Sequence, residues 1–208
     1  MKKRITLFAI LIFYCINIYA QSDPVLPDTC SVVTDMPDTS GYIVKTVGPS
    51  GSDYSDLQTA INDAQLGWIL KLDAAASFQG SFYLPNKTSG SGWIIIMSSR
   101  MDLLPDIGTR VNPTAATGNV TFPTQADAMA KIITTNLSGL PTFYTQDYAH
   151  HYRLIGLEIT IDQSVTNSYG LVNLGDISGN QTSLPVAPHH FIIDRCYIHG
   201  HTNATIMK

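Results

Sequence analysis

The sequence predicts an all-β protein, a parallel β-helix of about three coils that has an N-terminal capping helix and an uncapped C-terminal end. Three observations lead to this expectation. The chain of 208 residues is poor in charge (13% Asp, Glu, Lys and Arg), and its β-branched and turn-forming residues favour strands and turns. One amphipathic helix precedes a series of short apolar segments. One of these segments recurs 39 residues later in the chain.

The first residues predict export. Lys2, Lys3 and Arg4 form a basic start, Ile5 to Ile18 is almost wholly apolar, and Ala20 offers a small residue for cleavage. This pattern is typical of a secretory signal peptide over residues 1–20, and its apolar part is short for a membrane span. We therefore expect a secreted protein, extracellular or periplasmic, with no membrane span.

The charge of the exported part bears on its partners. Without the three basic residues of the signal peptide, 9 Lys and Arg face 16 Asp and Glu, a net charge of −7. This balance argues against nucleic acid, because phosphate binding needs clustered basic residues. It leaves an anionic glycan open as a partner, held through a bound cation. We expect a monomer.

The mature chain divides into two parts. Residues 21–41, with Pro24, Pro27 and Pro37, resemble a flexible leader, and residues 42–208 suit one domain with its own core. Cys30 lies in the leader and Cys196 in an apolar strand, so we expect no disulfide between them.

The first elements of the domain are a short strand at Tyr42–Val44 and one helix. Ser55 is the expected N-cap and Gln58, three residues on, completes a capping-box pattern. One apolar stripe predicts that the helix lies on an apolar surface, and Gly67 is placed to end it. The stripe consists of Leu57, Ala60, Ile61 and Ala64.

Short apolar strands separated by turns follow the helix. Their spacing alone also suits a β-sandwich or barrel. The expected strands are 69–72, 82–84, 93–97, 131–134, 152–161, 171–174 and 191–198.

The internal repeat favours coils. Residues 150–159 align without a gap on residues 189–198, which pairs Tyr152 with Phe191 and Leu157 with Cys196. Chance similarity between two amphipathic strands is the alternative. On the coil interpretation, Cys196 faces the core, whereas Glu158 and Tyr197 face outward. The coils then cover about 69–97, 131–161 and 170–199, and a fourth begins at 205–207, so we expect the natural protein to be longer than this chain.

Two stretches of the chain resemble the pectate-lyase-like superfamily of right-handed parallel β-helices. They are Gly51–Ile61, continued by Ile69–Leu72 and Phe78–Gly80, and Phe191–Ile198. The resemblance, which extends over residues 42–207, implies a right-handed coil and a polysaccharide ligand. The motif around Ile193-Asp194-Arg195-Cys196 lacks the Trp and His of pectate lyases, and the chain has no Asp-Asp pair, so the reaction stays open.

The doubled histidines at 150–151 and 189–190 suggest a metal site or a structural stack. The repeat places His150 over His189 and His151 over His190 at the strand spacing of about 4.8 Å. Zinc would need its ligands to converge at about 2.0–2.1 Å. We therefore expect stacking and no metal. We expect His199 and His201 to be solvated turn residues.

Candidate substrate-binding residues come from the lyase interpretation. A lyase of this kind uses Ca²⁺ to bridge the uronate and a Lys or Arg to take the proton. On this interpretation a groove lies along one side of the strands. The candidates that would line it are Lys131, Asn173 and Asp176, with Asp162 nearby. No carboxylate cluster is visible, so catalytic residues are expected beyond Lys208.

Two functions therefore remain at this point. The first is a secreted carbohydrate-active protein, in particular a lyase of acidic glycans. The alternative is a surface adhesin or glycan-binding scaffold without catalysis, which explains the missing motifs equally well.

Overall fold

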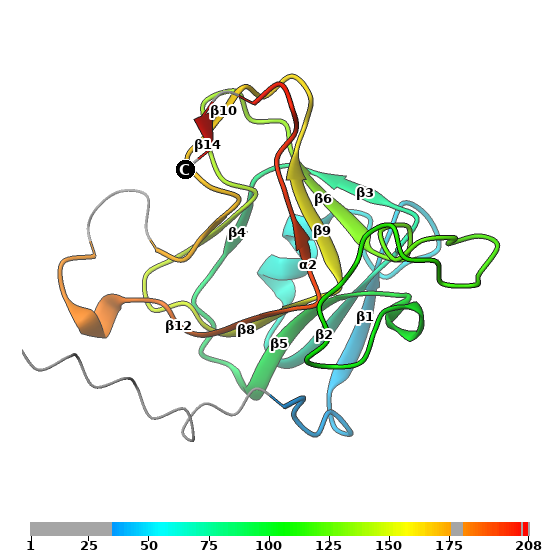
Figure 1. Cartoon of the computed structure of the whole chain (residues 1–208). Helices are drawn as coiled ribbons and strands as arrows, with labels where there is room; N and C mark the ends of the chain where they lie inside the picture. The colour runs from blue at the N-terminus through cyan, green and yellow to red at the C-terminus, as the bar shows by residue number, and fades with distance from the viewer. Residues whose placement is uncertain (1–34, 176–180, 205, 208) are drawn as a thin grey trace, which may run out of the picture. The chain divides into compact units, whose positions relative to one another are not determined.

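The computed structural model of the chain is dominated by short parallel β-strands (Figure 1). It describes residues 35–175, 181–204 and 206–207. Residues 35–208 form one unit, to which the following description applies. The expected signal peptide at 1–20, most of the leader, Cys30 and Asp176 lie outside the described residues.

The largest sheet has five parallel strands in the order β1-β2-β5-β8-β12. Its apolar residues align across the strands, so that Leu70 faces Ile96, Ile96 faces Leu154 and Leu154 faces Ile193. This alignment follows from the period of two in a strand, which places one apolar set on the core face. The strands are β1 (Ile43–Val47), β2 (Leu66–Leu72), β5 (Gly90–Ser98), β8 (His150–Ile155) and β12 (His189–Asp194).

The remaining strands form three smaller parallel sheets. A four-stranded sheet has the order β13-β9-β6-β3, a three-stranded sheet the order β11-β7-β4, and β10 pairs with β14. The four-stranded sheet consists of β3 (Ser77–Gln79), β6 (Ala130–Thr134), β9 (Leu157–Ile161) and β13 (Tyr197–Ile198). The other strands are β4 (Phe82–Leu84), β7 (Phe143–Thr145), β10 (Asn167–Ser168), β11 (Val172–Asn173) and β14 (Ile206–Met207).

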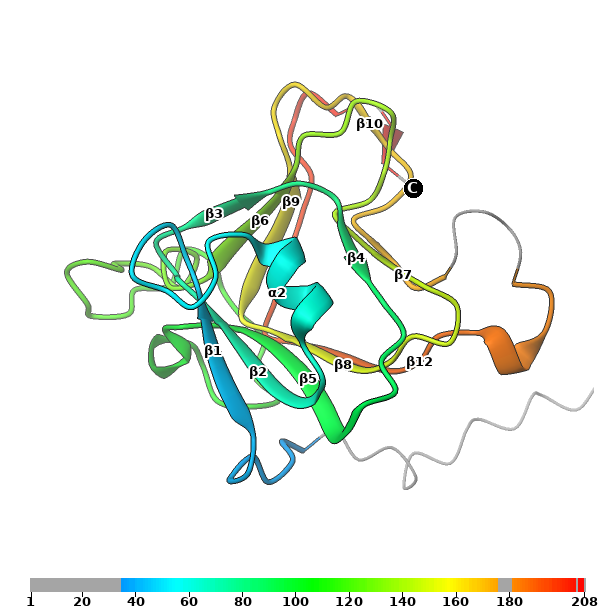
Figure 2. The same cartoon turned by 180° about the vertical axis from the view of Figure 1, so that it is seen from behind.

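The predicted helix is present as α2 (Leu57–Asp63; Figure 2). Its apolar stripe is fully buried. Its ends differ from the prediction. Asp56 is the N-cap, because its carboxylate accepts the backbone N–H of Thr59 at 2.7 Å. The Gln58 side chain instead bonds the backbone of Tyr83, which ties the helix to β4. The helix ends with Ala64 as C-cap, and Gly67 belongs to β2.

One apolar core joins the helix and the sheets. Tyr152 and Phe143 are its largest fully buried side chains, and Ile61 from α2 and Leu154 from β8 pack into it. A second, smaller cluster lies on the segment between β5 and β6, where Leu104, Ala128 and Met129 are buried. This segment includes a 3₁₀ turn at Met101–Leu103, and a second such turn lies at Leu184–Val186.

The prediction of a right-handed parallel β-helix of about three coils, with a capping helix and an uncapped end, is wrong. The described strands form four separate parallel sheets of five, four, three and two strands, and the structure shows no β-helix solenoid. The 39-residue interval is not a general period: Trp68 faces Ile94, Ile94 faces Tyr152, and Tyr152 faces Phe191. A match between one pair of strand units therefore does not define a repeating coil.

The pairing that the repeat predicts is nevertheless confirmed. β12 lies parallel to β8 with Phe191 opposite Tyr152, and β13 lies parallel to β9 with Ile198 opposite Ile159. The expected strands 152–161 and 191–198 are each broken once, the first at Gly156 (φ 64°) and the second at the aligned Arg195 (φ 49°). The left-handed backbone at these positions turns the chain from one sheet into the next.

Within the described residues, no helix has the length and apolar character that a membrane crossing requires.

Candidate functional site

An ion cluster lies on the four-stranded sheet, where Lys131, Glu158 and Tyr197 occupy one row across β6, β9 and β13. The Lys131 ammonium is 3.5 Å from Glu158 Oε2, and His199 Nε2, two residues beyond Tyr197, is 3.1 Å from Glu158 Oε1. The Tyr197 and His199 rings are stacked with centroids 4.1 Å apart. We call Lys131, Glu158 and His199 the Lys–Glu–His cluster.

The hydrogen bonds of His199 determine how many protons this cluster holds. Nδ1 lies 2.8 Å from the Gly200 carbonyl oxygen, which can only accept, so Nδ1 carries a proton. Nε2 faces a Glu158 oxygen, so the second contact needs a further proton, either on Nε2 or on the carboxyl group. The Glu158–His199 pair therefore shares one transferable proton.

The cluster is only partly open to solvent. The Glu158 side chain is 12% exposed, whereas that of Lys131 is 38% exposed, so the ammonium is the group that a solute meets first. Glu158 Oε2 is buried and accepts no hydrogen bond within the described part of the chain. Tyr197, the third member of the row, packs against the second apolar cluster.

The second feature consists of four histidines at the start of β8 and β12. Successive side chains of a strand normally point to opposite faces. His151 (φ 58°) and His190 (φ 56°) instead adopt a left-handed backbone, which brings each ring beside that of the preceding histidine. The Nδ1 atoms of His150 and His151 are 2.7 Å apart, and those of His189 and His190 are 2.5 Å apart.

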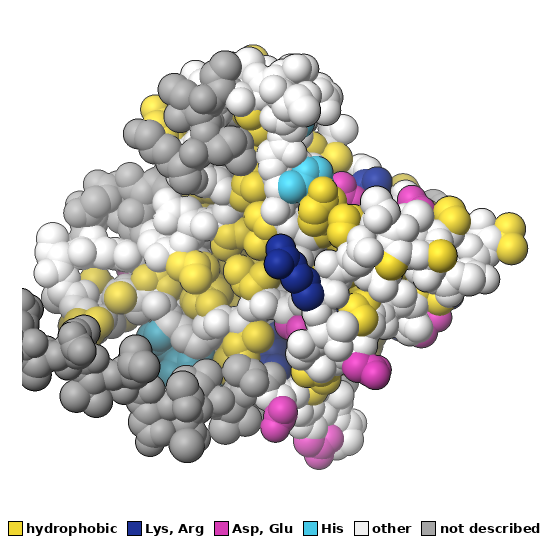
Figure 3. All heavy atoms as spheres, viewed as in Figure 1, with side chains coloured by type: hydrophobic (Ala, Val, Ile, Leu, Met, Phe, Trp, Pro, Cys, Tyr) yellow, Lys and Arg dark blue, Asp and Glu magenta, His cyan; other side chains and the backbone are white. Residues whose placement is uncertain are grey.

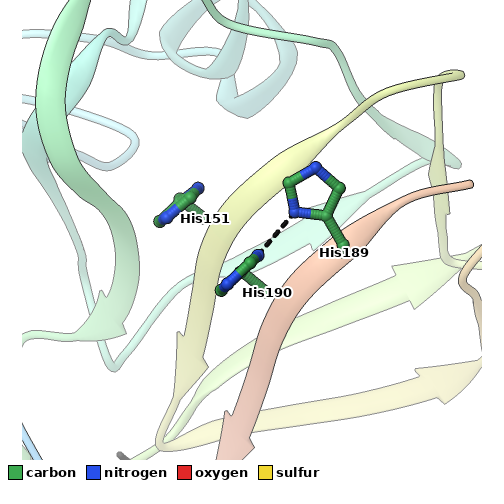
Figure 4. Close-up of side chains that lie close together, drawn as sticks. All are labelled: His151, His189 and His190. Carbon is green, nitrogen blue, oxygen red and sulfur yellow. Dashed lines mark hydrogen bonds between the residues drawn. The ribbon is translucent and has the colours of Figure 1, made fainter. Parts of the chain in front are cut away.

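The two histidine pairs stack directly on one another. The rings of His150 and His189 have centroids 5.3 Å apart, those of His151 and His190 have centroids 4.5 Å apart, and both pairs are parallel within 5°. The predicted stacking is thus confirmed. Figure 4 shows that His151, His189 and His190 also lie close together, and a nitrogen of each is within 4.8 Å of the others.

Electrostatics favour the neutral imidazole at His150 and His151. Burial lowers the pKa of His150 and His151, and the neighbouring histidines lower these two pKa values further by charge repulsion. Trp93 from β5 lies edge-on against His151, with ring centroids 5.1 Å apart. Arg153 in turn lies over the Trp93 ring at 4.4 Å.

The candidate residues from the sequence do not come together. Lys131 belongs to the four-stranded sheet and Asn173 to β11 in the three-stranded sheet. Asp162 follows β9 and holds its own turn, since its carboxylate accepts the backbone N–H and the hydroxyl of Ser164. Asp176 lies outside the described residues. Of the three candidates that the structure describes, only Lys131 is part of a polar cluster.

Two residues of that cluster were missed. Glu158 was placed on the outward face without a role, although the repeat aligns it with Tyr197. His199 was expected to be a solvated turn residue, yet its ring is 29% exposed and bonds Glu158. Nothing in the sequence indicated that Lys131 lies opposite Glu158, because β6 and β9 do not resemble each other in sequence.

Comparisons with known proteins yield no relative: no family model, no curated protein and no solved structure matches the chain. The two clusters described above are therefore the features that bear on function. On the face shown in Figure 3, basic side chains stand singly and do not form a patch.

Proposed function

We propose that the protein acts outside the cytoplasm on an acidic polysaccharide, which it binds at the Lys–Glu–His cluster. One observation carries the proposal: a partly exposed ammonium, that of Lys131, lies beside a carboxylate–imidazole pair that shares a proton. The basic and then apolar start of the chain supports the same compartment.

The chemistry of the cluster suits a uronate. The carboxylate of the uronate pairs with the Lys131 ammonium, and this pairing weakens the 3.5 Å contact between Lys131 and Glu158. Glu158 Oε2 is buried, so Lys131 is the group of this pair that contacts the sugar. Since Lys131 supplies the positive charge, this mode of binding does not depend on Ca²⁺.

The shared proton adds an acid–base capability. In an elimination, a base removes the proton next to the uronate carboxylate, and an acid protonates the departing glycosidic oxygen. His199 and Glu158 can exchange one proton between them, so the pair can serve in either role. Without that step, the same contacts give a glycan-binding scaffold.

Binding to uronate polymers tests the proposal. We expect polygalacturonate or alginate to bind the protein, a neutral polysaccharide not to bind, and Lys131→Met to weaken binding by about tenfold or more. Lys71→Met is the matched control, because Lys71 is an exposed strand lysine outside the cluster. Affinity electrophoresis measures both variants.

Absorbance near 235 nm, where the unsaturated product of elimination absorbs, separates a lyase from a scaffold. A rise that Glu158→Gln abolishes supports the lyase, and binding without a rise supports the scaffold. The proposal fails if no uronate polymer binds, or if Lys131→Met and Lys71→Met bind equally well.

A further inference from the structure

We infer that the stacked histidines form a binding site for a divalent transition-metal ion, with His151, His189 and His190 as the ligands. This site belongs to a different sheet from the Lys–Glu–His cluster, and the inference goes beyond the proposed function. It rests on the number and the spacing of imidazole nitrogens at one place on β8 and β12.

The backbone brings these nitrogens together. A left-handed residue at the second position of each pair overrides the alternation of a strand, so both imidazoles of a pair share one side. The parallel register then sets His189 directly opposite His150 in the neighbouring strand. Four imidazoles are thus collected from two dipeptides, which would not happen if both segments were regular strands.

The spacing is within reach of a single ion. Imidazole nitrogens bind zinc at about 2.0–2.1 Å, which puts two nitrogens of a tetrahedral site about 3.3 Å apart. In the cluster, His189 and His190 bring their Nδ1 atoms to 2.5 Å, and the largest separation among the three ligands is 4.8 Å. The tetrahedral value lies between these distances, so ring rotations can bring the three nitrogens onto one ion.

The hydrogen bonds also leave room for a cation. Two facing Nδ1 atoms can bond only if one carries a proton and the other offers its lone pair. A metal ion can take the place of that proton if the donating ring changes tautomer and carries its proton on Nε2, because both Nδ1 lone pairs then face the ion. The contact between His189 and His190 is then replaced by two coordinate bonds.

The donor set restricts the kind of metal. Imidazole nitrogen suits Zn²⁺, Cu²⁺ and Ni²⁺, whereas Ca²⁺ and Mg²⁺ prefer carboxylate and carbonyl oxygen. The three grouped ligands are all histidines. We expect Cu²⁺ to bind more tightly than Ni²⁺ or Zn²⁺, following the general order of divalent affinities, and Ca²⁺ not to bind.

The site is reachable from solvent. His189 and His190 are exposed, while His151 is half-buried between Trp93 and His190. An ion can approach from the side of β12, and three protein ligands leave a coordination position for water. Trp93 lies close enough to His151 to report the ion through its fluorescence.

Titration of the tag-free chain with Cu²⁺, Ni²⁺, Zn²⁺ and Ca²⁺ by calorimetry tests the site. We expect one transition-metal ion per chain, and a loss of affinity of about tenfold or more in His151→Asn and His190→Asn. Asparagine is chosen because it tolerates the left-handed backbone and lacks the imidazole. His201→Asn is the control, since His201 lies outside the cluster and bonds Val165 and Asn203.

Quenching of Trp93 emission by Cu²⁺ gives a second measurement, and Trp93→Phe identifies the signal. Circular dichroism shows whether each variant keeps the fold. If none of the three transition metals binds at one equivalent, or if His190→Asn and His201→Asn bind alike, the histidines are a structural stack and the inference is wrong. The uronate-binding assay uses another site and is decided separately.

Discussion

Among the described residues, left-handed backbone at non-glycine positions is confined to strands β8 and β12 and the turns beside them. Tyr148, His151, His190 and Arg195 have φ values between 49° and 60°. Such a conformation costs about 1–3 kcal/mol per residue and persists only where its surroundings hold it. His151 and His190 align in neighbouring strands, so the same strain is accepted twice, and both times it brings two imidazoles together.

Position 90 requires glycine both for its backbone conformation and for the space around it. Its φ of 86° is left-handed, and an added Cβ would collide with the backbone carbonyl oxygen of Leu66 in the neighbouring strand. We expect Gly90→Ala to lower the free energy of unfolding by about 2–4 kcal/mol, from conformational strain and overlap together. Urea denaturation measures the loss.

Gly108→Ala is the matched control for that substitution. Gly108 has a similar φ of 81°, but nothing lies within 4 Å of the added Cβ. We expect it to cost about 1–2 kcal/mol, since only the strain remains. Equal losses of unfolding free energy in the two variants would show that β2 and β5 do not approach each other closely at Gly90.

At the scale of elements, the start of α2 depends on one side chain. The Asp56 carboxylate accepts both the backbone N–H and the hydroxyl of Thr59, each at 2.7 Å. We expect Asp56→Ala to destabilise the protein by about 1 kcal/mol, because an N-terminal amide loses its acceptor. The shift in the urea midpoint reports this loss.

Ser55→Ala provides the comparison. Ser55 is the cap that the sequence pattern predicts, but the structure gives the cap to Asp56. We therefore expect no loss of stability in this variant. A larger effect at Ser55 than at Asp56 would restore the predicted capping box.

The positions of helices and strands could be predicted from the sequence where apolar residues recur at a regular spacing or where two segments resemble each other. The apolar stripe of α2 and the pairing of β8 with β12 follow from spacing and from the similarity of two segments. The N-cap residue of the helix could not be predicted, since Ser55 and Asp56 are adjacent and either side chain can cap a helix. The partner of Lys131 was not predictable either, because β6 and β9 are brought together by packing and share no motif.

At the scale of the whole molecule, the sequence predicted parallel strands but not their assembly. The segment between β5 and β6 builds its own buried cluster around Met129, and the sheets differ in size from five strands to two. A single repeat could not foresee either feature, because both depend on contacts between segments that are unlike one another.

Stability of the whole molecule should depend on pH through Asp53. Its carboxylate accepts the backbone N–H and hydroxyl of Thr46 and pairs with Lys45, which together lower its pKa from 3.8 to about 2. Since the folded pKa is the lower one, this stabilisation is complete above about pH 4 and is lost as the pH falls toward 2. Melting temperature against pH measures it.

Asp53→Asn separates this group from the other carboxylates. The variant should melt at a lower temperature than the unmodified protein at neutral pH, and the gap should narrow between pH 4 and pH 2. A gap that stays constant over this range would mean that the Asp53 carboxylate does not supply the difference.

The position of Cys196 bears on how this cysteine responds to oxidants. Its thiol packs against the core, and burial raises its pKa to about 12, so Cys196 presents almost no thiolate in the folded protein. Oxidation and disulfide exchange proceed through the thiolate and need access to it. Packing of the last strands thus acts as chemical protection for this cysteine, and a chain that meets oxidants before these strands have docked exposes it to cross-linking with other chains.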